Sequence, residues 1–164
     1  MIGLFAASLL AAPVVSAGEW ATYTNDRFGT SVQIPESDLR ALPAPQNGDG
    51  QGWVSKDTDV SLVVYGSYWG VTVESWDDYR TDMRRYMLEE KVILTYAPRG
   101  DGWFVLSGKV GDNIVYMRVS RSKRCPDIAH HLRLEYPAAQ KERRDAMVAR
   151  VSKSMGEVPS AACP

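Results

Sequence analysis

Three strand-forming segments follow one another between residues 92 and 120, separated only by short breaks. The segments cover residues 92–96, 103–109 and 114–120, and the breaks at 98–102 and 111–113 are rich in glycine and aspartate. Connections this short join antiparallel neighbours, because a parallel crossover takes about a dozen or more residues. This stretch therefore predicts an antiparallel meander and argues against a parallel α/β sheet.

Strand signals continue on both sides of this meander. Aromatic and β-branched residues predict strands at 20–23, 28–34, 53–55, 60–65 and 129–136. Gly66 is expected to end the strand at 60–65. Residues 36–52 contain Pro43, Pro45 and several glycines, which predicts a long surface loop.

Two amphipathic helices interrupt the strand pattern. Ser75 and Asp78 match a capping box before an aromatic stripe at helical spacing, which predicts a helix over 76–90. A second helix is predicted with Pro137 in its first turn and is expected to stop at Gly156. Because such helices bury one face, the predicted fold class is α+β: a twisted antiparallel sheet of about six to seven strands with both helices packed on it.

The first 17 residues carry no charged side chain and end in the small residues Ser16 and Ala17. This pattern is typical of a secretory signal peptide that is cleaved after Ala17. Its apolar stretch is too short to span a bilayer core of about 30 Å, so no stable membrane insertion is expected after cleavage. A buried N-terminal helix is the alternative, but the stretch has no amphipathic face.

These features predict the organisation of the whole chain. A signal peptide occupies residues 1–17, a single α+β domain covers 18–156, and a C-terminal tail covers 157–164. The mature protein is expected to be periplasmic or secreted.

Cys125 and Cys163 are the only cysteines. An exported chain meets an oxidising compartment, where such a pair tends to form a disulfide, so we predict that the two are bonded and tie the tail to the domain. Loop-closure entropy gives such a bond a contribution of about 3 to 4 kcal/mol. A redox pair is the alternative, but redox cysteines usually lie close together, as in C-x-x-C.

The charge balance bears on the possible partners. The chain has 19 basic and 20 acidic residues, a formal net charge of −1, so neither nucleic acid nor anionic lipid is an expected partner. A small basic cluster comprises Arg118, Arg121, Lys123 and Arg124. No aromatic residue interleaves with it, which favours a solvated strand end over a nucleic-acid site.

No metal, cofactor or catalytic motif of useful specificity is found in the sequence. The loop at 47–52 resembles the start of a calcium loop, but Asp49 is its only charged ligand position and Thr58 stands where a bidentate Glu is needed. The nucleophile and zinc motifs of common hydrolases do not occur. We therefore predict no cofactor, no metal and no assigned catalytic residue.

The two histidines, His130 and His131, are neighbours on one predicted strand and point to opposite faces. His130 is expected to be half-buried with a backbone or hydroxyl partner. His131 shares its face with Arg133 and Glu135, and an antiparallel neighbour is expected to add further polar groups. The candidate functional surface comprises Tyr116, Arg118, His131, Arg133 and Glu135, with Ser120 beside them. The alternative is a polar sheet face with cross-strand ion pairs.

The segment 23–35 resembles the opening hairpin of PsbP-like and Mog1-like domains. Tyr23, Asn25, Phe28, Gly29, Ser31 and Pro35 carry this resemblance, and the order of the remaining elements is similar. At Thr30 the family commonly has an aromatic residue. The resemblance implies the same α+β fold and an accessory or adaptor role through protein contacts, without catalysis.

Three functions remain open at this point. The first is an exported, non-catalytic protein that binds an unknown protein or envelope component through its sheet face or its Pro/Gly-rich loop. The second is an envelope hydrolase that uses His131 with Glu135. The third is a small-ligand carrier with a pocket lined by Trp53, Tyr65, Tyr68 and Trp69.

Overall fold

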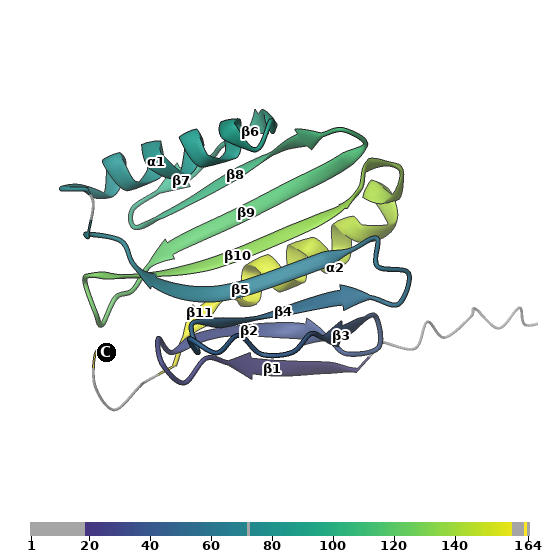
Figure 1. The fold of residues 1–164 in the computed structure, drawn as a ribbon, viewed down its shortest axis with the longest axis horizontal. Helices are drawn as coiled ribbons and strands as arrows, with labels where there is room; N and C mark the ends of the chain where they lie inside the picture. Colours follow the sequence, from purple (N-terminus) through teal and green to yellow (C-terminus); the bar gives the residue numbers. More distant parts are fainter. Residues whose placement is uncertain (1–18, 72, 159–162, 164) are drawn as a thin grey trace, which may run out of the picture.

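The computed structural model describes residues 19–71, 73–158 and 163 (Figure 1). The predicted signal peptide at 1–17 lies outside the described residues, as does part of the predicted tail. In the part of the chain that is described, no helix is long and apolar enough to cross a membrane.

A large antiparallel sheet forms the centre of the molecule. Its strand order is β3-β4-β5-β10-β9-β8-β6, and β7 pairs with β8 beside this path. The strands are β3 (Leu39–Ala41), β4 (Gly50–Ser55), β5 (Ser61–Tyr68), β6 (Ile93–Tyr96), β7 (Arg99–Gly100), β8 (Trp103–Val110), β9 (Asn113–Arg121) and β10 (Ile128–Pro137). The predicted meander is β6, β8 and β9, and Gly111 makes its tight turn with a positive φ of 54°.

A small sheet and two helices complete the fold. The small sheet has the order β1-β2-β11, with β1 (Trp20–Thr24), β2 (Thr30–Pro35) and β11 (Gly156–Glu157). The helices are α1 (Trp76–Glu89) and α2 (Lys141–Ser154), and the short 3-10 helix η1 (Ala138–Gln140) precedes α2. The predicted cap is present, because the Asp78 amide donates to the Ser75 hydroxyl at 3.1 Å. The predicted α+β class is confirmed.

The helices cover opposite faces of the large sheet, and each covers a different half (Figure 1). On one face, α1 contributes Tyr79 and Met87 to a core with β8 and β9. On the other face, α2 contributes Met147 and Val151, which pack with β2, β5 and β10. The β6 and β8 half of the second face therefore lies beside α2 rather than beneath it.

The predicted loop at 36–52 is wrong in part. It contains β3, and β4 already begins at Gly50. Leu39 is buried in the core against Trp53 and anchors β3 there. One apolar residue in a Pro/Gly-rich stretch gives no periodic signal, so the sequence pattern missed this edge strand.

Two strand boundaries also differ from the prediction. β5 does not end at Gly66 but runs on to Tyr68. Gly66 is needed there because Phe28 packs against it: a Cβ at this position would lie 2.2 Å from the Phe28 Cβ. β2 begins at Thr30 rather than at Phe28, since the Asn25 side chain accepts the Phe28 amide at 2.8 Å and closes a turn.

Candidate binding groove

The residues predicted to form one functional surface lie on opposite faces of the large sheet. His131 of β10 pairs with Val119 of β9, and Leu132 pairs with Arg118. Directly paired residues share a face, so Tyr116, Arg118 and Ser120 lie on the face covered by α2. His131, Arg133 and Glu135 lie on the face covered by α1. The prediction that they adjoin one another is therefore wrong.

The register between β9 and β10 explains this difference. The Ser122 amide donates to the Ile128 carbonyl at 2.9 Å, which closes a connection formed by residues 123–127. A shift of one residue in pairing moves every side chain of a strand to the other face. The irregular connection, which contains Cys125 and Pro126, therefore decided which side chains of β9 share a face with His131. The sequence has no two-residue turn here that would have fixed the pairing.

His131 is a core residue. Its side chain is 1% exposed, and its Nε2 lies 2.9 Å from the Ser67 hydroxyl and 3.1 Å from the Tyr79 hydroxyl. Burial, with a smaller effect from His130, lowers the pKa of His131 to about 3. Glu135 lies four residues away on the same strand, roughly 13 Å at the usual rise. The structure does not bring the predicted acid–base pair together.

Arg133 and Glu135 belong to an ion-pair network beneath the end of α1. Arg133 lies 2.9 Å from Glu90 and 3.4 Å from Glu135, and the Asn113 amide donates to Glu135 at 3.0 Å. Burial alone raises the pKa of Glu90, but hydrogen bonds from Tyr86 and Arg133 outweigh it and lower that pKa. This network joins helix to sheet and lies within β10, so it differs from the cross-strand ion pairs of the structural alternative.

His130 joins the large sheet to the small one. It is 2% exposed, not half-buried as predicted, and its Nδ1 lies 2.8 Å from the Thr30 hydroxyl of β2, the hydroxyl partner that was expected. Its Nε2 lies 3.2 Å from Glu157 of β11. Burial lowers the pKa of His130, although Glu157 opposes this. The ring thus holds β2, β10 and β11 together.

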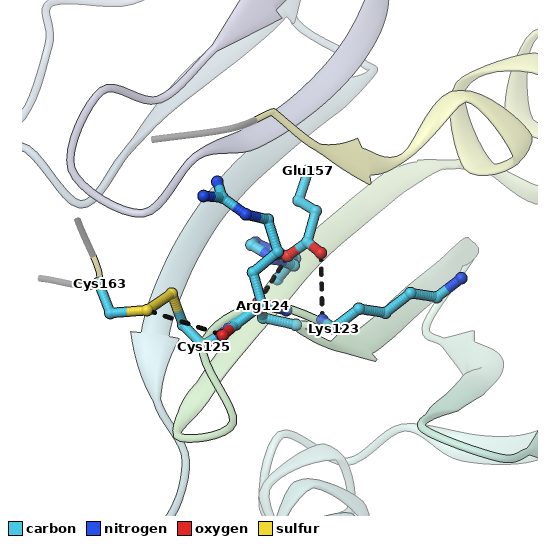
Figure 2. The surroundings of a disulfide bond; sticks show 7 residues. Lys123, Arg124, Cys125, Glu157 and Cys163 are labelled. Carbon is cyan, nitrogen blue, oxygen red and sulfur yellow. Dashed lines mark hydrogen bonds and ion pairs between the residues drawn. A yellow bond between two sulfur atoms is a disulfide. The ribbon is translucent and has the colours of Figure 1, made fainter. Parts of the chain in front are cut away.

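Glu157 and the disulfide hold the C-terminal segment against the β9–β10 connection (Figure 2). Cys125 and Cys163 are bonded with an S–S distance of 2.02 Å, so the predicted disulfide is confirmed. Glu157 accepts hydrogen bonds from the Ser122 hydroxyl at 2.5 Å and from the Lys123 amide at 3.1 Å. Burial raises the pKa of Glu157, but these bonds and His130 together lower it, which favours the carboxylate.

A groove lies beside α2, on the face of the large sheet that this helix covers. It consists of two cavities of about 750 and 550 Å³ that share Arg118 in their lining, and we call it the α2 groove. Its floor is the uncovered half of β8 and β9, with Ser107 and Tyr116, and one wall is α2. The Tyr116 hydroxyl lies 2.7 Å from Ser152 and connects floor to wall.

Basic side chains outnumber acidic ones in this groove. The basic residues of the lining are Lys109, Arg118, Arg121, Lys123, Lys141 and Lys153, and the acidic ones are Asp101, Asp145 and Glu157. Lys141 is paired with Asp145 at 2.7 Å. No ion pair between described residues includes Lys109, Lys123 or Lys153. The groove is therefore positive, although the chain as a whole is not.

Arg118 occupies the centre of the groove. Its guanidinium carbon lies 5.2 Å from the centre of the Trp103 ring, which holds the side chain by a cation–π contact. Its Nε is buried, and no partner for it is found among the described residues. The basic cluster has no aromatic residue within its own stretch of sequence. The fold supplies one, because β8 brings Trp103 beside Arg118.

Two other predictions concern ligands elsewhere in the chain. In the loop resembling a calcium site, Asp49 is paired with Arg27 at 2.5 Å, and no cluster of three or more metal-binding side chains occurs in the described ranges. The four aromatics of the predicted carrier pocket do not meet. Trp53 packs on Tyr23, Tyr65 on His131, Tyr68 on Phe28, and Trp69 on Trp76.

Comparison with solved structures places this arrangement among known folds. The solution structure of PsbP (CyanoP) from Synechocystis sp. matches with a TM-score of 0.64 at 13% identity, covering 92% of this chain and 99% of that one. The Ran-binding protein Mog1p of Saccharomyces cerevisiae matches with a TM-score of 0.56 at 9% identity, covering 87% and 97%. The chain has a PsbP/Mog1-like fold. No sequence-family model and no curated protein matches it in sequence.

Within this PsbP/Mog1-like fold, the departure at Thr30 has a local explanation. Thr30 is fully buried and supplies the hydroxyl that meets His130. The groove residues Lys109 and Lys153 were missed by sequence reasoning, because single lysines on a strand and a helix carry no signal until α2 is placed beside β8 and β9.

Proposed function

We propose that this protein is an exported, non-catalytic binding protein that acts through contacts with a protein or an envelope component. The observation that carries the proposal is the α2 groove, a basic hollow centred on Arg118 and built on a rigid sheet. Concave sites with a few converging polar groups are the usual places of binding.

The covalent structure supports the exported part of the proposal. Disulfides persist in oxidising compartments and are rare in the cytosol of ordinary cells. The bond between Cys125 and Cys163 agrees with the uncharged N-terminal stretch, which is typical of a signal peptide. Both observations favour the periplasm or the extracellular space.

The state of the titratable groups supports binding rather than acid–base catalysis. His131 is enclosed in the core, and its low pKa keeps the ring neutral. His130 and Glu157 are bonded to each other and to β2 and the β9–β10 connection. These groups serve the fold, whereas Lys109, Lys123 and Lys153 line the groove without an ion pair to another described residue.

The fold supports the same conclusion by analogy. Mog1p, which shares it, is a Ran-binding protein and thus binds another protein. A fold alone does not carry a function, so the analogy adds only to what the groove indicates.

A site-specific photo-crosslinker tests this function in the living cell. Tyr96, which is 57% exposed and lines the groove, is replaced by a benzophenone amino acid, and Tyr68, 39% exposed outside the groove, serves as the matched control. We expect a discrete adduct from Tyr96 in the cell envelope and none from Tyr68. Absence of any adduct from Tyr96, or equal adducts from both positions, would contradict the proposal.

A further inference from the structure

The outer wall of the α2 groove is an open strand edge. β6 is the last strand of the large sheet, and no strand in the described ranges pairs with its outer side. Ile93, 73% exposed, and Tyr96 pair with Lys109 and Ser107, so they face the same side as the groove floor. An open edge offers unpaired backbone N–H and C=O groups to another extended chain.

The cations of the groove are spread along the strand direction. Lys109 pairs with Ile114, and Arg118 lies four residues farther along β9, which places the two positions roughly 13 Å apart at the usual rise. Lys153 of α2 lines the same cavity as both. A compact anion meets one of these groups, whereas an extended chain with repeated carboxylates meets several.

The guanidinium of Arg118 is preorganised to bind a planar anion. The Trp103 ring fixes its guanidinium, and its buried Nε has no partner among the described residues. A fixed guanidinium binds a carboxylate through two parallel hydrogen bonds, and little side-chain freedom is lost on binding.

From these observations we infer that the α2 groove binds an extended acidic peptide segment of a partner protein, an inference that rests on the proposed function. The segment lies along the outer edge of β6, and the carboxylates on its groove side extend past Ile93 and Tyr96 toward Lys109, Arg118 and Lys153, while the alternate side chains face the other side of the sheet. Anionic glycans and nucleic acids lack the backbone amides that pair with a strand edge. A nucleic-acid base would need a free face of Trp103 for stacking, but Arg118 already covers one face of that ring.

Fluorescence anisotropy with the purified exported protein tests this inference. The probe is a short labelled peptide in which Glu and Val alternate. We expect it to bind, and to bind several-fold more weakly in high salt because the attraction is ionic. The same peptide with Gln in place of Glu is expected to lose binding. Two further peptides carry methyl groups on the odd-numbered or on the even-numbered backbone nitrogens. One is expected to lose binding and the other to keep it, because only one of these two sets of N–H groups faces β6.

Variants of the protein locate the binding. Arg118→Gln is expected to lower the affinity for the acidic peptide about tenfold or more. Arg118→Lys keeps the charge but not the planar guanidinium, so its affinity is expected to lie between those of the unmodified protein and Arg118→Gln. The matched control is Arg84→Gln, an exposed arginine on α1 outside the groove, with an expected change within about twofold. Circular dichroism of each variant checks that the fold is retained.

Three results would overturn the inference: equal affinity for the Gln peptide, tighter binding of oligogalacturonate or of single-stranded DNA, or equal losses in Arg118→Gln and Arg84→Gln. A Tyr96 crosslink to an envelope protein without any affinity for acidic peptides would also overturn it and would leave the proposed function standing. Peptide binding that depends on Arg118, without any crosslink in the cell, would instead contradict the proposed function and leave the chemistry of the groove intact.

Discussion

The imidazole of His131 stacks on the phenol ring of Tyr65, with ring centroids 4.3 Å apart and planes 5° apart. The pair lies where α1 and the large sheet meet, and the edge of Tyr79 contacts the same imidazole. Charging His131 would place an unpaired cation in this core, since its Nδ1 has no partner among the described residues.

Acid should therefore destabilise the fold through His131. The folded pKa of about 3 lies below the ordinary value of 6.5, so the unfolded chain binds the proton first and the contribution of His131 is lost as pH falls from about 6.5 toward 3. Between about pH 7 and pH 5 the loss from this group is about 2 kcal/mol. Urea unfolding at the two pH values measures it.

His131→Phe is the matched variant for this measurement, because it keeps a ring against Tyr65 and removes the titration. Its free energy of unfolding should depend less on pH than that of the unmodified protein. An unchanged pH dependence in the variant would show that other groups cause the acid sensitivity.

Removal of the disulfide should lower stability. Cys125→Ser together with Cys163→Ser opens a link across 38 residues, and the expected loss in the free energy of unfolding is about 3 to 4 kcal/mol. Reduction of the unmodified protein is the control and should give a similar loss in urea unfolding. An unfolding midpoint that reductant does not change would contradict a stabilising bond.

Thr30→Val should lower the free energy of unfolding, because it removes the hydroxyl that contacts His130. The substitution keeps the shape of the side chain but leaves the buried Nδ1 without its partner at 2.8 Å, and the expected loss is about 1 to 3 kcal/mol. Thr30→Ser keeps the hydroxyl and should lose less. Equal losses in the two variants, measured by thermal unfolding, would assign the effect to packing instead.

The N-terminal prediction is checked by mass spectrometry of the exported protein. Signal peptidase cleavage after Ala17 should give a chain that begins at Gly18, because small residues and an uncharged apolar stretch precede that bond. An intact Met1 on the folded protein would favour the alternative of a buried N-terminal helix.

Local chemistry allowed much of the fold to be predicted from the sequence. Ser75 and Asp78 define the start of α1 because a helix cap involves only residues three apart. Gly111 defines the β8–β9 hairpin because its backbone adopts a positive φ. Such signals arise from neighbours along the chain, so they survive without knowledge of the tertiary structure.

The candidate site was predicted less well, because it depends on which segments meet. Leu39 carries no strand pattern and became part of β3 only by packing against Trp53. Tyr116 and Arg118 were assigned to the face of His131, since a strand pattern gives the alternation of side chains but not the register of its partner.

The sequence by itself determined both helices, the long strands, the antiparallel meander and the pair of cysteines able to bond, since these follow from residue type and spacing. Only the tertiary structure decided that His131 is enclosed, that Trp103 holds Arg118, and that Lys109 and Lys153 line one groove. The physical reason is that burial and charge depend on distances across the fold, and those distances were set by the β9–β10 connection and by the position of α2.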